Sequence, residues 1–233
     1  MESEKLKIVF DIETSGFPLE TFSESQQEYL MRYVEKEKDE ELRSEKELEA
    51  IRYLNLYPFT AKVIVIGLMN ITTGNRYIIF ESEEPKEWDV EEKKISYHGM
   101  TEEEMLIKFW YFLTKADKLI SFNGRQFDLP FLMLRSAMLK IKPSRNFIKS
   151  RYDTTKHIDL LDQFTFYGLT RKFNLDFYSR AFGIESPKSN GITGMDVNEL
   201  YRAGKIEDIA IYCGDDIKAT AELYSIWETY LKF

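Results

Sequence analysis

Short runs of apolar residues, separated by polar turns, set the first expectations for this chain. They occupy residues 5–12, 61–69, 76–80, 118–122 and, more briefly, 158–161. Runs of this length that are rich in β-branched and aromatic side chains predict strands buried on both faces. Thr72-Thr73-Gly74-Asn75 lies between the second and third runs and predicts a hairpin turn. The pattern therefore predicts a five-stranded sheet.

Apolar residues at helical spacing predict the remaining elements. Thr101 followed by Glu104 is a capping-box pattern at the start of one helix. A second helix is expected from Phe127 to Met138, and a last one from about residue 206 to 231. The region 164–203 is predicted to be mostly helical, with breaks at glycine and proline. This order predicts a single α/β domain over residues 1–233, with a mixed sheet flanked by helices.

Residues 24–55 differ from the rest of the chain. Between Glu35 and Glu49 twelve of fifteen residues are charged, and the apolar exceptions are Leu42 and Leu48. Such a run is typical of a solvated helix with Glu–Lys pairs. The alternative is a charged helical insertion that projects beside a site and moves over substrate, and the sequence does not decide between them. The acidic segment 82–92 is predicted to be a loop.

Composition excludes several classes of protein. With 233 residues, 43% hydrophobic and 15% aromatic, the chain can form a substantial core. Its single cysteine, Cys213, excludes an internal disulfide and a multi-cysteine zinc cluster. No apolar run approaches the ~20 residues of a membrane span, and the N-terminus lacks the layout of a signal peptide. We therefore expect a cytoplasmic protein that has no contact with membranes.

The net charge of −8 argues against a protein whose whole surface coats nucleic acid. It is compatible with an enzyme that has a local basic track and bound cations. One such track is predicted between residues 140 and 156, where six basic residues face a single acid and two aromatic residues are interleaved; Lys142, Arg145, Lys149 and Arg151 are its central cations. This composition favours contacts with the phosphates and bases of a single strand. The alternative is a solvated loop.

Two acids at the end of the first predicted strand indicate a metal site. Asp11 and Glu13 are two residues apart, so their side chains point to the same side of a strand. Like charges side by side repel unless a cation lies between them, and carboxylate oxygens suit Mg²⁺ or Mn²⁺. The pair by itself also fits a strand end that frays into the polar turn 14–16.

A third acid lies on the apolar face of the last predicted helix. Spacing of three and four residues places on one face Ile209, Tyr212, Asp216, Ala219, Leu223, Ile226 and Tyr230. Asp216 would therefore be carried against the sheet, whereas Asp215 falls on the polar face. A buried carboxylate is costly unless it is paired or bound to metal, so Asp216 either joins a metal site or pairs with an arginine or a helix N-terminus. Asp128, in the first turn of another helix, suits the helix dipole whether or not it has a function.

As a set, these acids resemble the three motifs of the DEDD exonucleases, which are the DnaQ-like 3′→5′ exonucleases of the ribonuclease H fold. The matching stretches are Asp11-x-Glu13, Asn123-x₃-Phe127-Asp128 and Tyr212-x₃-Asp216. Tyr212 in place of a histidine is similar to the DEDDy branch, which includes ribonuclease D and the proofreading domains of family B DNA polymerases. The flanking stretches 57–60, 157–160 and 201–216 also resemble the polymerase-B type.

The resemblance implies a ribonuclease H-like fold and two divalent cations, Mg²⁺ or Mn²⁺, about 3.5–4 Å apart. Their ligands would be Asp11, Glu13, Asp128 and Asp216. By the same resemblance Asp11 would bridge both ions and Glu13 would serve the ion nearer the attacking water. Tyr212 would orient that water. Thr14 and Asn123 would lie near the terminal nucleotide, while Phe127 would lie there or only in the core.

The remaining polar features receive structural interpretations. Arg171, Lys172, Arg180 and Lys188 form a second, weaker basic group. His98 precedes a turn and a helix cap, His157 stands alone before a strand, and Cys213 is a small residue of the last helix. Since Tyr212 occupies the place of a catalytic histidine, neither histidine is assigned to the site.

The expected function is that of a metal-dependent 3′–5′ exonuclease that releases nucleoside 5′-monophosphates from single-stranded nucleic acid. The polymerase-B-like flanks favour DNA, and the alternative within enzymes is an exoribonuclease that trims RNA ends. Proofreading would require a separate polymerase or repair protein as partner. An alternative of another class is a nucleic-acid-binding protein with an exonuclease fold that does not cleave. The complete set of four acids and Tyr212 argues against it.

Overall fold

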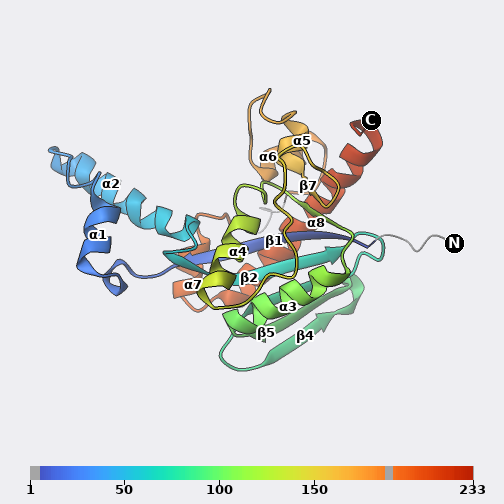
Figure 1. Ribbon diagram of the computed structural model, residues 1–233, viewed down its shortest axis with the longest axis horizontal. Helices are drawn as coiled ribbons and strands as arrows, with labels where there is room; N and C mark the ends of the chain where they lie inside the picture. Colours follow the sequence, from blue (N-terminus) through green and yellow to red (C-terminus); the bar gives the residue numbers. More distant parts are fainter. Residues whose placement is uncertain (1–5, 187–190, 233) are drawn as a thin grey trace.

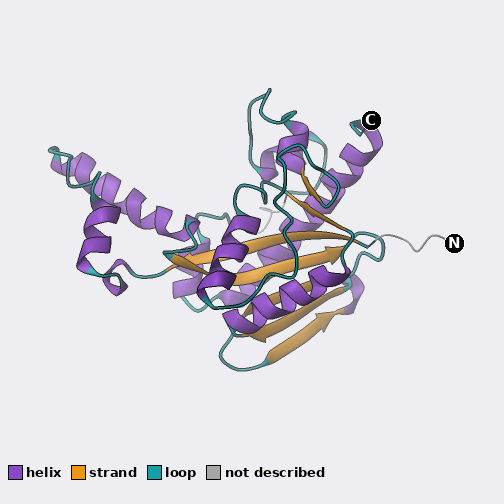
Figure 2. Ribbon diagram, in the orientation of Figure 1, coloured by secondary structure: helices purple, strands orange, loops and turns teal. Residues whose placement is uncertain are grey.

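The computed structural model of the chain describes residues 6–186 and 191–232. Lys188 and residue 5, where the first strand was expected to begin, lie outside the described residues. The fold is built on a seven-stranded mixed sheet in the order β4-β5-β3-β2-β1-β6-β7, which Figures 1 and 2 show with helices on both faces. Its strands are β1 (Lys7–Gly16), β2 (Ala61–Asn70), β3 (Arg76–Glu81), β4 (Lys86–Val90), β5 (Ile95–Met100), β6 (Lys118–Ser121) and β7 (His157–Asp159).

The prediction of five strands was wrong, because it missed β4 and β5. β4 lies within the segment expected to be an acidic loop, and none of its residues is buried. β5 alternates buried and half-buried residues, and it pairs in parallel with β3 and antiparallel with β4. His98 lies in β5 and stacks on Tyr77, whereas the sequence placed it at a turn. These strands are fixed by pairing with distant residues, which a search for apolar runs does not detect.

β1 is the central strand and is longer than expected. It pairs antiparallel with β2 from Ile8 to Gly16, with a bulge between Glu13 and Thr14, and in parallel with β6. The polar residues 14–16 therefore belong to the strand rather than to a turn. The hairpin predicted between β2 and β3 is present, with Gly74 at φ 73°.

The helices cover both faces of the sheet. α8 (Ile206–Tyr230) packs against one face, with Val9, Val65 and Ile217 in its apolar cluster. α3 (Glu102–Lys115) and α4 (Asp128–Met138) pack against the other face, where Phe10 and Phe109 lie in a second cluster. The capping box at Thr101 and the long last helix agree with the sequence prediction. Successive residues of β1 thus support opposite layers.

The region 164–203 contains less helix than predicted. α5 (Leu160–Phe164) ends at the residue where the predicted helical region begins. Within that region, α6 (Leu175–Ala181) and α7 (Val197–Arg202) are short. Phe166, Tyr167 and Gly168 have positive φ angles, which end the helical path directly after α5. Figure 1 places α5, α6 and β7 together at one end of the sheet.

The charged insertion forms two helices, α1 (Glu24–Met31) and α2 (Glu40–Tyr53), that project from the sheet as an arm (residues 24–53). Neither helix has a buried residue. Their starts are stabilised locally, by the capping box of Ser23 and Gln26 and by Asp39, which accepts from the amides of Glu41 and Leu42. Movement of the arm over substrate stays a prediction. No described helix combines the length and the apolar character that crossing a membrane requires.

Candidate active site

Three carboxylates from two elements meet beside the central strand. Asp11, Glu13 and Asp216 each contribute one oxygen to a group whose atoms all lie within 4.8 Å of one another. Asp11 and Glu13 share a side of β1 because the bulge begins only after Glu13. Asp216 is 7% exposed on the face of α8 that packs on the sheet, while Asp215 is half-buried.

A glycine allows α8 to approach the sheet this closely. A Cβ atom on Gly67 of β2 would lie 2.9 Å from the Cys213 Sγ and 3.1 Å from Ile217. The Cys213 thiol is buried and lies 3.9 Å from the main-chain oxygen of Asp11. Burial raises the pKa of Cys213 well above its usual value, so the thiol is a neutral packing group beside the carboxylates.

Asp128 is tied to the same strand from the opposite layer. It is 3% exposed at the start of α4, and its Oδ1 accepts a hydrogen bond of 3.1 Å from the amide of Ile12, between Asp11 and Glu13. The preceding turn is equally tight, since a Cβ atom on Gly124 would lie 2.4 Å from the Ser121 Oγ. The hydrogen bond from the Ile12 amide thus holds Asp128, a fourth acid, beside the strand that carries Asp11 and Glu13.

Burial and mutual repulsion make this cluster unfavourable without a cation. Burial, followed by the charges of the neighbouring acids, raises the pKa of Asp11 and that of Glu13 well above their usual values. Burial also raises the pKa of Asp128 to about 7, although the amide of Ile12 opposes the shift. Oxygen-only ligands in such a cluster fit hard divalent cations such as Mg²⁺ and Mn²⁺. Binding of cations would replace the protons and relieve the repulsion.

Tyr212 lies one turn before Asp216 on α8 and is also buried. Burial and then the charges of Asp216, Glu13 and Asp11 raise the pKa of Tyr212 well above its usual value. The phenol therefore stays protonated, and it can donate a hydrogen bond but cannot remove a proton.

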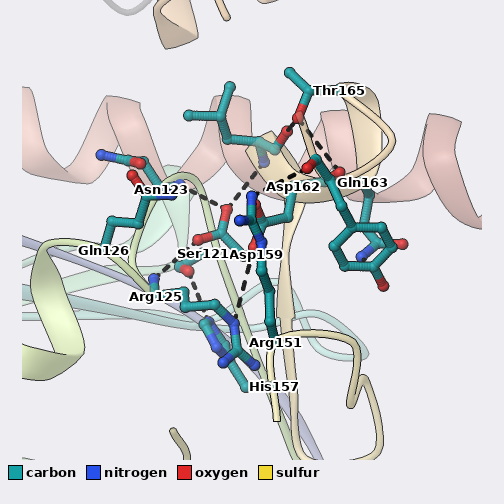
Figure 3. Close-up of polar contacts among 12 residues, drawn as sticks. Ser121, Asn123, Arg125, Gln126, Arg151, His157, Asp159, Asp162, Gln163 and Thr165 are labelled. Carbon is teal, nitrogen blue, oxygen red and sulfur yellow. Dashed lines mark hydrogen bonds and ion pairs between the residues drawn. The ribbon is translucent and has the colours of Figure 1, made fainter. Parts of the chain in front are cut away.

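Asp159 holds the turn that precedes Asp128, and sequence reasoning did not assign it a role. Its carboxylate accepts from three backbone amides, those of Asn123 (2.9 Å), Arg125 (2.9 Å) and Leu161 (3.0 Å). Figure 3 shows Asp159 below Asn123 and beside Arg125. Asn123 has φ 66°, a left-handed conformation that this carboxylate stabilises by accepting its amide. An acid directly after a short apolar strand is a helix-cap signal, but that signal does not reveal the bond to a distant turn.

The charges around Asp159 are paired within the protein. Asp162 is buried between Arg125 at 3.8 Å and Arg151 at 3.4 Å. His157 shares a hydrogen bond of 2.8 Å with the Ser121 Oγ, and burial lowers the pKa of His157 to about 3. The neutral imidazole therefore has the structural role that the sequence suggested. Figure 3 shows these residues as one polar group under the turn.

The other proposed nucleic-acid contacts occupy varied positions. The Thr14 hydroxyl donates to the main-chain oxygen of Asn55 at 2.8 Å, and Phe127 is half-buried against Phe131. Two of the four predicted cations are engaged by protein atoms: Arg145 donates to the main-chain oxygen of Ala116 at 3.0 Å, and Arg151 pairs with Asp162. The other two, Lys142 and Lys149, are exposed.

Comparisons with known proteins identify related sequences and folds. Residues 60–231 match a family described as "predicted 3′-5′ exonuclease related to the exonuclease domain of PolB". No curated protein sequence matches the chain. Among solved structures it is similar to the family B DNA polymerase from the hyperthermophilic archaeon Pyrobaculum calidifontis, with a TM-score of 0.62 and 16% identity. That match covers 97% of this chain but 25% of the polymerase, so the chain spans about a quarter of its length.

The structural match establishes the ribonuclease H-like α/β fold, and the family match confirms the resemblance to polymerase-B exonucleases. The residues matched to the family include Asp128, Tyr212 and Asp216. They begin after Asp11, Glu13 and the arm. The geometry of the carboxylate cluster thus supplies the part of the site that the family match does not cover.

Proposed function

Because the chain belongs to the family of predicted 3′–5′ exonucleases related to the exonuclease domain of PolB, we propose that it hydrolyses single-stranded DNA from the 3′ end. The products are nucleoside 5′-monophosphates. The observation that carries this proposal is the convergence of Asp11, Glu13 and Asp216 within 4.8 Å. Asp128 is bonded to the strand between the first two.

The four acids hold two divalent cations in this proposal, Mg²⁺ or Mn²⁺. Asp11 and Glu13 would be the ligands from β1, and Asp128 and Asp216 would be the ligands from α4 and α8. The cations, when bound, supply an activated water and stabilise the charge of the phosphate and of the leaving 3′ oxygen. Tyr212, kept protonated by its surroundings, orients the water by donating a hydrogen bond. The turn held by Asp159 keeps Asp128 in place.

The terminal nucleotide lies beside Thr14 and Asn123, with Phe127 at the edge of the core. Lys142, Arg145, Lys149 and Arg151 contribute positive charge along the strand behind it. Among these, the exposed Lys142 and Lys149 contact phosphates directly, since the other two guanidinium groups are bonded to protein atoms.

DNA is favoured because the chain is similar in fold to a DNA polymerase. An exoribonuclease is the alternative within enzymes. Proofreading or repair would be performed with a separate polymerase or repair protein. A non-cleaving binding protein is disfavoured because all four acids and Tyr212 are present.

The experiment compares single strands labelled at the 5′ end or at the 3′ end, as DNA and as RNA, with Mg²⁺, Mn²⁺ or EDTA. We expect a 5′-labelled DNA to give a ladder of shortened strands and a 3′-labelled one to lose its label as a mononucleotide. Cleavage in EDTA would contradict the metal mechanism. Faster cleavage of RNA would select the exoribonuclease, and the absence of cleavage with both metals would select the binding protein.

A further inference from the structure

Large apolar side chains face solvent close to the turn that precedes Asp128. The aromatic loop, residues 166–173, connects α5 to α6 and includes Phe166, 52% exposed, and Leu169, 85% exposed. The ring of Tyr167 contacts that of Tyr152 at 4.9 Å, and Tyr152 is itself 69% exposed. Exposed apolar groups gathered from two segments mark an interaction surface.

The backbone of this loop is held in a costly conformation. Phe166 and Tyr167 have φ angles of 48° and 60°, which bulky residues rarely adopt because the left-handed region is strained for them. Two hydrogen bonds maintain the conformation: the amide of Tyr167 donates to the main-chain oxygen of Asp162, and Arg151 donates to that of Tyr167 at 3.1 Å. The loop is therefore a rigid support for its exposed side chains.

Further contacts connect the aromatic loop to the proposed active site. Lys172 Nζ lies 3.3 Å from the side-chain oxygen of Gln126, which belongs to the turn before Asp128. Asp162 also pairs with Arg125 of the turn, and Asp159 binds the turn from the start of α5 (Figure 3). The loop thus lies next to the turn that presents Asp128.

The charge of the surface is opposite to that of the protein as a whole. Arg171 and Lys172 lie in the aromatic loop, and Arg151 reaches it from the segment that carries Tyr152. Arg171 is stacked over Phe173, whose ring stacks on Phe177 at 4.1 Å. Aromatic faces alternating with cations suit the bases and phosphates of a single strand. Arg151 and Tyr152 of the first basic segment therefore join Arg171 and Lys172 at one surface.

We propose that the aromatic loop, together with Tyr152, binds the nucleotides that lie behind the 3′-terminal one. Phe166 and Leu169 contact bases, while Arg171 and Lys172 contact phosphates. This inference rests on the proposed exonuclease function and deepens it, since it names the surface that contacts a long strand and is not reached by a short substrate.

The test compares substrates that reach the loop with one that does not. The p-nitrophenyl ester of thymidine 5′-monophosphate occupies only the terminal position, whereas strands of 3, 6 and 12 deoxynucleotides extend beyond it. For the double variant Phe166→Ala/Leu169→Ala we expect kcat/KM on the 12-mer to fall about tenfold, within the range of one or two lost base contacts. Activity on the ester should stay within about twofold.

The matched control is Ile107→Ala/Tyr111→Ala on α3, which removes two apolar side chains that are 52% and 54% exposed. We expect this control to leave both substrates unaffected. An equal loss on the ester and the 12-mer, or no loss on either, would overturn the role of the loop while leaving the exonuclease intact.

Binding supplies a measurement that does not depend on cleavage. In Asp216→Ala protein, fluorescence anisotropy with a labelled 12-mer should show about tenfold weaker binding when Phe166 and Leu169 are replaced. Arg171→Gln/Lys172→Gln should reduce the salt dependence of binding, because fewer counterions are released. Equal binding by all variants would overturn the proposal. Binding without any cleavage by the wild-type protein would contradict the proposed exonuclease and leave the strand surface supported.

Discussion

The arm and the carboxylate cluster accommodate charged residues in opposite ways. The arm exposes its charges, and neither of its helices buries a residue. Between its two helices and the segment 54–60 lies a pocket of about 730 Å³, lined by aromatic residues that include Tyr29, Tyr33 and Tyr53. At the cluster, by contrast, Glu13, Asp128 and Asp216 are each less than 10% exposed. Burial, followed by the charges of neighbouring acids, raises the pKa of Glu13 and that of Asp128.

The two regions also differ in what maintains them. The helices of the arm depend on caps and on pairs such as Lys46–Glu37, all formed by residues close in sequence. The cluster depends on strands, turns and helices that meet from distant parts of the chain. The strand that carries Asp11 and Glu13 meets the segment that follows the arm, where the Thr14 hydroxyl donates to the main-chain oxygen of Asn55. Replacements should therefore affect function at the cluster and have little effect on either function or stability in the arm.

The largest expected effect is at Asp216. Asp216→Ala should lower kcat/KM on a 5′-labelled strand by about a thousandfold or more, roughly 4 kcal/mol, because it removes one of the four proposed cation ligands. Asp215→Ala is the matched control on the neighbouring, half-buried position, and we expect less than about a threefold loss. A larger loss for Asp215→Ala would show that the wrong face of α8 has been assigned to the site.

The second effect concerns stability in the core and in the arm. Leu113 of α3 is 0% exposed, whereas Leu48 of α2 is 60% exposed. Leu113→Ala should lower the free energy of unfolding by about 2–5 kcal/mol through lost burial and a cavity, and Leu48→Ala by less than about 0.5 kcal/mol. Urea unfolding followed by circular dichroism measures both. Comparable losses would mean that the arm packs against other residues in solution.

The third effect tests the positioning of Asp128. Asp159→Asn keeps one acceptor oxygen but loses the other, so the amides of Asn123 and Arg125 cannot both be satisfied. We expect kcat to fall about 10- to 100-fold, or roughly 1.4–2.7 kcal/mol, with a higher Mg²⁺ concentration required for half-maximal activity.

The control for Asp159→Asn is Asp153→Asn, which alters a cap in an exposed loop. It should leave both kcat and the Mg²⁺ requirement unchanged. If Asp159→Asn lowered stability without changing the Mg²⁺ requirement, Asp159 would support the fold and not the metal ligands.

The smallest effect is the pH dependence of stabilisation by metal. Burial raises the pKa of Asp128 in the folded protein to about 7, well above its usual value, so ionising this carboxyl between pH 6 and 8 destabilises the metal-free protein by roughly 1 kcal/mol. The stability that the protonated Asp128 contributes to the folded protein is present at low pH and is lost as the pH rises through 7. Mg²⁺ or Mn²⁺ should therefore raise the melting temperature more at pH 8 than at pH 6, by a few degrees.

His157 contributes in the opposite direction, because its pKa is lowered to about 3. The stability that neutral His157 contributes is lost as the pH falls below the usual pKa of histidine. This loss is the same with and without metal. The difference between metal-bound and metal-free melting temperatures therefore isolates the acids. An equal difference at pH 6 and pH 8 would contradict the raised pKa of Asp128, and Asp216→Asn should reduce the difference at both.

Local patterns in the sequence were sufficient for much of the architecture. The apolar runs predicted β1, β2, β3, β6 and β7, because strands buried on both faces need side chains of that kind. Helical spacing on α8 separated Asp216 from Asp215. It could not predict that Tyr230 at the end of the same face would be 73% exposed, since that depends on where the sheet ends.

The sequence by itself determined the five strands with apolar runs, the site-bearing face of the last helix and the types of residue at the site, because each depends on residues close along the chain. Only the tertiary structure decided that Asp11, Glu13 and Asp216 meet, since their approach requires Gly67 under α8. It also decided the strands β4 and β5, the bond from Asp159 to the left-handed Asn123, and the contact of Tyr152 with Tyr167 at the aromatic loop. These features depend on contacts between distant segments, which leave no periodic signal in either segment.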